Sequence, residues 1–135
     1  MSKYSNGENN NMINEEMVDK IKTNIHNYFN ELLYSWNNAL FTGKVISEES
    51  LKKMIGKYAD SGEEGYYGYG IFTSDVKLGE KMRKKIYHGG GIPGFFASNS
   101  IFPTEDVQII MITNVVSEAF AHKISKVEEI IFKDI

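Results

Sequence analysis

The stretch Lys84–Phe102, "KKIYHGGGIPGFFASNSIF", combines the two features that decide how this chain folds. Three consecutive glycines follow His88, and the residues from Phe95 onward alternate in the manner of a β-strand. Glycine lets the backbone turn tightly or approach a ligand closely, so such clusters serve as phosphate loops, oxyanion holes or tight turns. The flanking sequence decides among these three uses.

Two familiar glycine motifs match this stretch in spacing but not in context. The pattern G-x-G-x-x-G, which begins at Gly89, is typical of dinucleotide-binding loops, but there the glycines open a helix rather than a strand. The pattern H-G-G-G, which begins at His88, is typical of lipase oxyanion loops, which need a downstream G-x-S-x-G nucleophile elbow. The sequence contains no such elbow. Both interpretations are therefore rejected.

Hydrophobic alternation on both sides of the glycines predicts an antiparallel sheet of three to four strands. The strand predicted last along the chain is strongly apolar, so we place it at the centre of the sheet. The predicted strands cover residues 67–72, 82–89, 95–102 and 107–113, and the predicted turns cover residues 74–80 and 103–106.

Residues with helical periodicity lie before and after these predicted strands. Apolar residues recur every three or four positions from Glu15 to about Phe41, which predicts one long amphipathic helix. Ser47, followed by two glutamates, is typical of the N-cap of a short second helix. A closing helix is predicted from the spacing of Phe120, Ile124, Val127 and Ile131. The fold class is therefore α+β, with N-terminal and C-terminal helices packed on the sheet.

Length and composition favour a single globular domain. The chain has 135 residues, of which 41% are hydrophobic, and this is enough for a substantial core. We expect residues 1–13, which are polar and rich in asparagine, to form a disordered leader, and residues 14–135 to form one α+β domain.

Composition also excludes several classes of partner and cofactor. A net charge of −3 argues against nucleic acid, which calls for a basic surface. The absence of cysteine excludes disulfides and thiolate chemistry, and the three histidines form no helical metal-binding pair, so no metal and no cofactor is expected. No apolar run approaches the ~20 residues that span a bilayer, and no secretory h-region is visible, so we expect a cytoplasmic protein without membrane contact.

The segment "YGYGIF…KKIYHGGGIPGFFASNSIFPTEDVQIIMITNV" resembles the C-terminal portion of the serine β-lactamase and penicillin-binding-protein-like hydrolases, the group of class C β-lactamases, esterases and D-aminopeptidases. The upstream segment "ELLYSWNNALFTGKVISEESLKKM" is similar to the helix, loop and helix that precede the final strands of that family. The resemblance covers about Glu31 to Phe132 and implies a partial β-lactamase-like fold.

The resemblance also implies roles for the residues after Tyr87. In this family a strand that bears Lys-Thr-Gly or His-x-Gly forms one wall of the active site, and His88-Gly89-Gly90 holds that position here. The family pattern places the Gly91 N–H near the oxyanion position and directs His88 to the anionic or polar end of the substrate. His88 and Gly91 are thus candidate catalytic residues, in vestigial form, and Gly89 and Gly90 are candidate substrate-binding residues.

The family nucleophile, a serine in a Ser-x-x-Lys motif, has no convincing counterpart in this chain. The literal match at Ser50 is rejected because it lies in the second helix, in a segment that already matches a different family element. The second family motif, Tyr-x-Asn, matches at Tyr4, in the predicted leader, and at Tyr28, whose side chain is predicted to lie in the core.

Two hypotheses about function follow from these observations. In the first, the chain is the rear part of a serine hydrolase, carries one wall of the active site without a nucleophile, and is inactive by itself. In the second, it is a binding module that holds a small molecule or a peptide on the exposed sheet and the glycine-rich strand. Apolar surface left open in either case could be covered in a homodimer.

Overall fold

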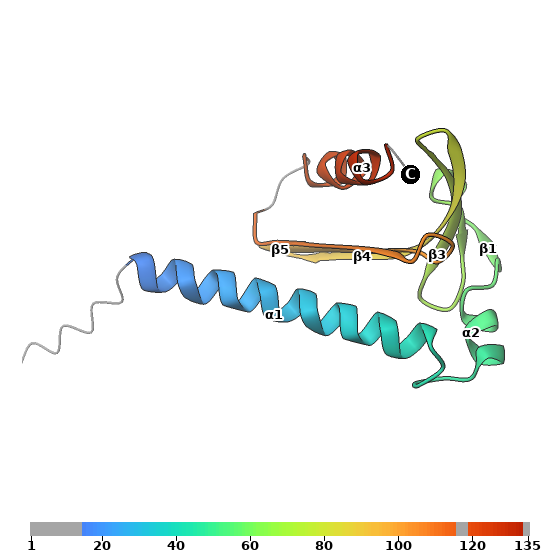
Figure 1. Ribbon diagram of the computed structural model, residues 1–135, viewed down its shortest axis with the longest axis horizontal. Coiled ribbons are helices and arrows are strands. Elements are labelled where there is room, and N and C mark those ends of the chain that lie inside the picture. Colours follow the sequence, from blue (N-terminus) through green and yellow to red (C-terminus); the bar gives the residue numbers. More distant parts are fainter. Residues whose placement is uncertain (1–14, 116–118, 134–135) are drawn as a thin grey trace, which may run out of the picture.

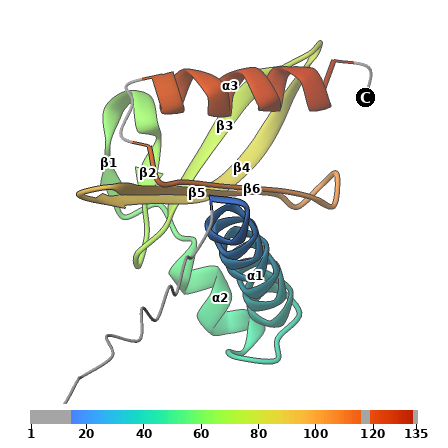
Figure 2. The same cartoon turned by 90° about the vertical axis from the view of Figure 1, so that its left-hand side faces the viewer.

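The computed structural model describes residues 15–115 and 119–133, so the predicted leader lies outside the described residues. One antiparallel sheet has a helix on each face, and Figure 2 shows α1 and α2 on one side of it and α3 on the other. The α+β class is confirmed. Six strands run in chain order from edge to edge: β1 (Ala59–Asp60), β2 (Tyr66–Tyr67), β3 (Phe72–Leu78), β4 (Lys81–Ile92), β5 (Phe95–Phe102) and β6 (Val107–Thr113).

The sheet departs from the predicted three to four strands at its first edge. The predicted strand at 67–72 is wrong, because the chain makes only the two-residue strand β2 and then turns at Gly70, whose φ is 77°. The predicted turn at 74–80 is also wrong, because β3 runs to Leu78 and the turn is confined to Gly79 and Glu80. In β3 the exposed residues Asp75 and Lys77 alternate with Val76 and Leu78, which are partly or fully buried, since one face of this part of the strand is open to solvent.

The apolar strand β6 lies at an edge of the sheet, not at its centre as predicted. Its hydrophobicity has another cause, because both of its faces are covered. Ile109 packs in the cluster beneath α3, and Gln108 bonds to α1 on the opposite face. A strand covered on both faces is apolar wherever it stands in the sheet order.

Helix α1 (Glu15–Phe41) is the predicted long helix and spans 27 residues. Figure 1 shows that it lies along one face of the sheet and that its N-terminal end extends past the end of the strands. Its last turns are anchored by Asn37 and Leu40, which are both buried. The short helix α2 (Glu48–Met54) begins at the predicted cap, where the Ser50 N–H donates to Ser47 Oγ at 3.2 Å.

The sheet separates two apolar clusters. The consecutive residues Ile101 and Phe102 of β5 point to opposite faces, and each is a member of a different cluster. The cluster on the α3 face contains Leu78, Phe102, Ile109 and Phe132. The cluster on the α1 and α2 face contains Ile71, Ile86 and Ile101, with Phe41, Met54 and Ile55 packed against it.

Helix α3 (Ala119–Ile131) is the predicted closing helix, but one residue of the apolar pattern that predicted it is not buried. Ile131 is exposed, and the fully buried Phe132 takes its place at the point where the chain leaves the helix. Lys85 of β4 forms an ion pair with Glu128 of α3 at 2.7 Å, and both side chains are largely buried. This pair ties the helix to the sheet. Within the described ranges, none of the helices has the length and apolarity needed to cross a bilayer.

Candidate functional site

Residues His88–Gly91, called here the glycine segment, lie where β4 extends beyond its neighbour β3. The pairing of β3 with β4 ends at Phe72 and Tyr87, whereas the pairing of β4 with β5 continues to Ile92 and Phe95. In the part of the chain that the structure describes, the glycine segment therefore has a strand on one edge only. Backbone groups on an open strand edge are available to a ligand or to another strand.

The three glycines of this segment have different physical reasons for lacking a side chain. A Cβ at Gly91 would lie 2.5 Å from Cε1 of Phe96, so this position must be small for the ring to pack across it. At Gly89 a Cβ would lie 3.3 Å from the carbonyl oxygen of Ala97, which is a tight contact. At Gly90 a Cβ would meet nothing within 4 Å. The chain's own packing therefore explains Gly91 but leaves the open space at Gly90 unused.

His88 lies on the α1 face of the sheet. Its cross-strand partner is Asn99, which bonds to Asn37 of α1, and directly opposed residues of neighbouring strands share a face. The side chain is exposed, and Nε2 lies 3.4 Å from the hydroxyl oxygen of Tyr67. The ring of Phe72 lies 6.0 Å away, centre to centre. His88 thus has one polar neighbour, the Tyr67 hydroxyl, and lies beside the aromatic ring of Phe72.

Tyr67 is the site residue that the sequence does not reveal. Alternation predicts it only as one residue of a longer strand, whereas the structure places it in the two-residue strand β2, next to His88. Its ring packs against Phe72 with centroids 4.4 Å apart. The contact with His88 joins residues 21 apart in sequence, so no local pattern could have indicated it.

A groove of about 500 Å³ borders the glycine segment on the α3 face, opposite to His88. Backbone of Gly89–Gly91 forms its floor, and apolar side chains of β5 and α3 form much of its sides. This volume falls within the range of small-molecule sites. Its lining side chains include Phe72, Lys85, Tyr87, Phe96, Ser98, Phe120 and Ile124.

Tyr87 stands at the polar end of this groove. Its hydroxyl donates to the carbonyl oxygen of Glu64 at 2.7 Å, and its ring stacks on Phe72 with centroids 5.2 Å apart. Burial, followed by the negative charges of Glu64 and Glu128, raises the pKa of Tyr87 above its ordinary value of 10.0. The neutral phenol is therefore the form that the folded protein favours.

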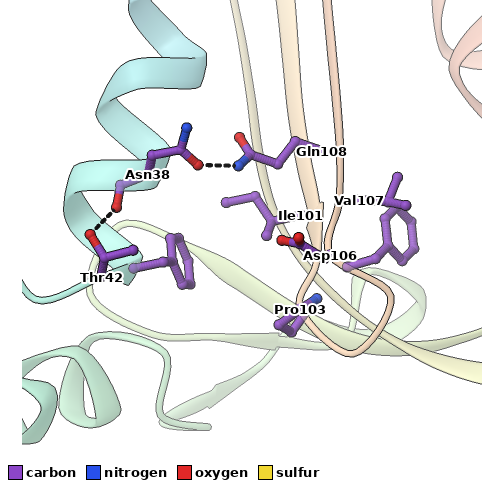
Figure 3. Close-up of a pocket in the computed structure, with 9 residues that line it drawn as sticks. Asn38, Thr42, Ile101, Pro103, Asp106, Val107 and Gln108 are labelled. Atoms are coloured by element: carbon purple, nitrogen blue, oxygen red, sulfur yellow. Dashed lines mark hydrogen bonds between the residues drawn. The ribbon is translucent and has the colours of Figure 1, made fainter.

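A separate pocket of about 250 Å³ lies between the C-terminal end of α1 and the turn that joins β5 to β6 (Figure 3). Three of its polar residues bond to one another, because Gln108 Nε2 donates to Asn38 Oδ1 at 2.8 Å and Thr42 Oγ1 donates to the Asn38 carbonyl oxygen at 2.5 Å. It shares no lining residue with the glycine segment. The candidate site is therefore not extended to this pocket.

The Ser-x-x-Lys match at Ser50 is built into the start of α2. Ser50 is exposed, and its hydroxyl oxygen lies 3.1 Å from that of Ser47. The Lys53 ammonium forms an ion pair with Glu49 at 2.7 Å. The serine and the lysine of this match are thus engaged in capping and pairing within the helix.

Of the two Tyr-x-Asn matches, the structure describes the one at Tyr28. Tyr28 is 60% exposed, so the prediction that its side chain lies in the core is wrong. Tyr4 lies outside the described residues. In the described ranges, no group of three or more His, Asp or Glu residues could hold a metal ion.

The arrangement of elements has a counterpart among solved structures. The crystal structure of a penicillin-binding protein from Bacillus halodurans matches this chain with a TM-score of 0.53 and 21% identity. The match covers 66% of this chain and 27% of that protein. The chain has a partial penicillin-binding-protein-like fold. No family model matches the sequence, and no curated protein is similar to it in sequence.

The penicillin-binding-protein-like fold agrees with the order of elements expected from the sequence, in which two helices precede the long strands and one helix follows them. This chain spans about a quarter of the length of the solved penicillin-binding protein. One fold supports several chemistries, so function has to be argued from the glycine segment and its surroundings.

Proposed function

We propose that this chain is the C-terminal part of a β-lactamase- or penicillin-binding-protein-like serine hydrolase and supplies one wall of its active site. The observation that carries the proposal is the open edge of the glycine segment, on a strand whose other edge is fully paired. The fold likeness to a penicillin-binding protein and the resemblance of the His-Gly-Gly strand to the family motif support it.

Each residue of the segment has a role in this proposal. Acyl transfer develops negative charge on the carbonyl oxygen, and preorganised N–H donors stabilise it. The Gly91 N–H would be such a donor, and His88 would contact the anionic or polar end of the substrate. Gly89 and Gly90 would let the substrate approach the backbone, and the open space at Gly90 agrees with this role. Tyr67 would hold the imidazole of His88 in place.

The chain by itself is proposed to be inactive. The family reaction needs a serine whose proton is drawn off by a neighbouring base. Among the described residues, the Ser-x-x-Lys match at Ser50 has its lysine paired with Glu49 and its serine bonded to the helix cap. A second match, at Ser74, lies in strand β3 and not on a helix, which is where the family motif stands. The nucleophile would therefore come from a segment other than this one.

Incubation of the full chain with a chromogenic ester, a chromogenic cephalosporin and a fluorescent penicillin tests this proposal. We expect no turnover and no covalent label. The matched control is Ser50→Ala, which should behave as the wild type does. Turnover or labelling by the wild type that disappears in Ser50→Ala would contradict the proposal, because it would make Ser50 the nucleophile.

A second candidate function is a binding module, favoured by the same open edge. An extended peptide could pair with β4 along residues 88–92 as an added strand, opposite to β5. An amide NMR titration with an acyl-D-alanyl-D-alanine peptide and with a benzylpenicillin tests it. Shifts concentrated at Gly89–Gly94 are expected, whereas shifts confined to other elements, or none with either compound, would count against it.

A further inference from the structure

We propose that helix α1 carries a self-association surface through which two copies of this chain pair in antiparallel orientation. The surface consists of Ile25, Tyr28, Phe29, Leu32 and Trp36, called here the α1 stripe. Their side chains are 46–60% exposed. Spacings of three and four residues place them along one side of the helix.

By its spacing, the α1 stripe continues toward the N-terminus the same side of the helix that ends in Leu40, four residues after Trp36. Leu40 is 4% exposed, whereas Trp36 is 51% exposed. This side of the helix is therefore covered at its C-terminal end, and the stripe is left open among the described residues.

The part of α1 around the start of the stripe has low intrinsic stability, because Asn24, Asn27 and Asn30 have poor helix propensity. Figure 1 also shows that the N-terminal end of the helix extends past the strands. Helices in globular proteins are held mainly by packing of an apolar side, and an isolated helical segment is marginal in water. A partner on the α1 stripe would supply that packing.

Composition favours a protein partner for the stripe. Tyrosine, phenylalanine and tryptophan are the residues enriched at interface centres, where charged residues are depleted. Between Ile25 and Trp36 the sequence has a single formally charged residue, Glu31, which is not a member of the stripe. An uncharged aromatic stripe of this kind meets no like-charge repulsion when it faces a copy of itself.

The pattern is self-complementary, which points to a second copy as the partner. A two-fold axis between Phe29 and Leu32 would bring Ile25 of one chain to Trp36 of the other, as an isologous contact requires. Half-exposed aromatic side chains of about 200 Å² each, with the two aliphatic ones added, offer roughly 500 Å² per chain. Roughly 1,000 Å² for the pair reaches the lower bound of a specific interface.

Sedimentation velocity of the full chain at low and high micromolar concentration tests the proposal. The wild type is expected to dimerise, and Phe29→Asp is expected to raise the dissociation constant about thirtyfold or more. Tyr34→Asp is the matched control, because Tyr34 is an aromatic residue of the same helix, 53% exposed and outside the stripe. Far-UV circular dichroism checks that both variants keep their helices. A wild type that stays monomeric, or an equal loss in Tyr34→Asp, would overturn the proposal.

The absence of cysteine makes the orientation testable by oxidative cross-linking. Leu32→Cys, near the proposed axis, should form a disulfide-linked dimer. Ile25→Cys alone should not, whereas a mixture of Ile25→Cys and Trp36→Cys chains should link to each other. Efficient linking of Ile25→Cys alone would show a parallel pair and refute the antiparallel arrangement. These outcomes are independent of whether the glycine segment belongs to a hydrolase.

Discussion

Asn37 of α1 and Asn99 of β5 exchange two hydrogen bonds of 2.8 Å, each side-chain amide donating to the carbonyl oxygen of the other. Asn37 also donates to Gln108 Oε1 of β6 at 3.0 Å. Asn99 is the cross-strand partner of His88, so this pair fixes the end of α1 next to the candidate site. A polar contact thus determines the position of the helix on an otherwise apolar face.

Replacement of Asn37 by leucine should lower the free energy of unfolding by about 2 kcal/mol, because the amides of Asn99 and Gln108 lose their partner in a partly buried place. Urea denaturation followed by circular dichroism measures this change. Asn27→Ala, an exposed substitution in the same helix, is the control and should leave stability unchanged or slightly raised. A loss in Asn37→Leu no larger than that seen in the control would refute the structural role of the pair.

The glycine segment offers a matched pair of substitutions. Gly91→Ala should destabilise the protein by about 1–2 kcal/mol, because its Cβ would displace the ring of Phe96. Gly90→Ala should be neutral or stabilising by about 0.5 kcal/mol, since space is open there and alanine is favoured over glycine within a strand. Thermal denaturation of the two variants side by side compares them, and equal midpoints would contradict the different packing of the two positions.

Removal of one partner of the buried Lys85–Glu128 ion pair should lower the free energy of unfolding strongly, whereas replacement of both partners by apolar residues should lower it little. Glu128→Gln leaves the Lys85 ammonium without its counter-charge, and a loss of about 3 kcal/mol is expected. The double variant Lys85→Met/Glu128→Leu should recover most of that loss. Glu129→Gln removes an exposed pair with Lys126 and should cost at most about 0.5 kcal/mol. Chemical denaturation of the four proteins compares these losses, and a double variant no more stable than Glu128→Gln would argue against the prediction.

Tyr87 should make the protein less stable in alkaline solution. Because its pKa is raised in the folded state, its contribution is complete below the ordinary value of 10.0 and is lost as pH rises through the higher folded value. Tyr87→Phe should remove this part of the pH dependence, and should cost about 1 kcal/mol at neutral pH through the lost bond to Glu64. Denaturation at pH values on either side of 10 tests this, with the exposed Tyr69→Phe as control. An unchanged alkaline slope in Tyr87→Phe would contradict it.

The sequence pattern alone predicted the position of those helices and strands that are determined by residues close together in the chain. The strands at 95–102 and 107–113 lie where alternation and turn chemistry place them, and α1 ends at Phe41 as predicted. The N-cap at Ser47 was equally predictable, because its hydroxyl bonds to a backbone N–H only three residues later. The resemblance to a hydrolase family located the His-Gly-Gly strand on the same basis, from a short run of residues.

Elements that depend on distant partners were not predictable in this way. The residues of β3 look like a turn because their polar side chains face solvent, and they form a strand only because β4 pairs with them. Tyr28 has the spacing of a core residue, yet its side chain is 60% exposed, because burial depends on what packs against the helix and not on spacing alone. The apolar β6 became an edge because sheet order is set by connections and pairing, not by hydrophobicity.

Periodicity and capping act over three or four residues and can be read from the sequence, so they predicted the helices, the strands β4, β5 and β6, and the α+β class. The open edge of the glycine segment, the contact of Tyr67 with His88 and the Asn37–Asn99 pair belong to the assembled fold. Each joins residues that are far apart in sequence or depends on where a neighbouring strand stops, as with the 62 residues that separate Asn37 from Asn99. Such contacts form when the sheet and helices pack, because their energy comes from burial and from pairing across elements rather than from neighbours along the chain.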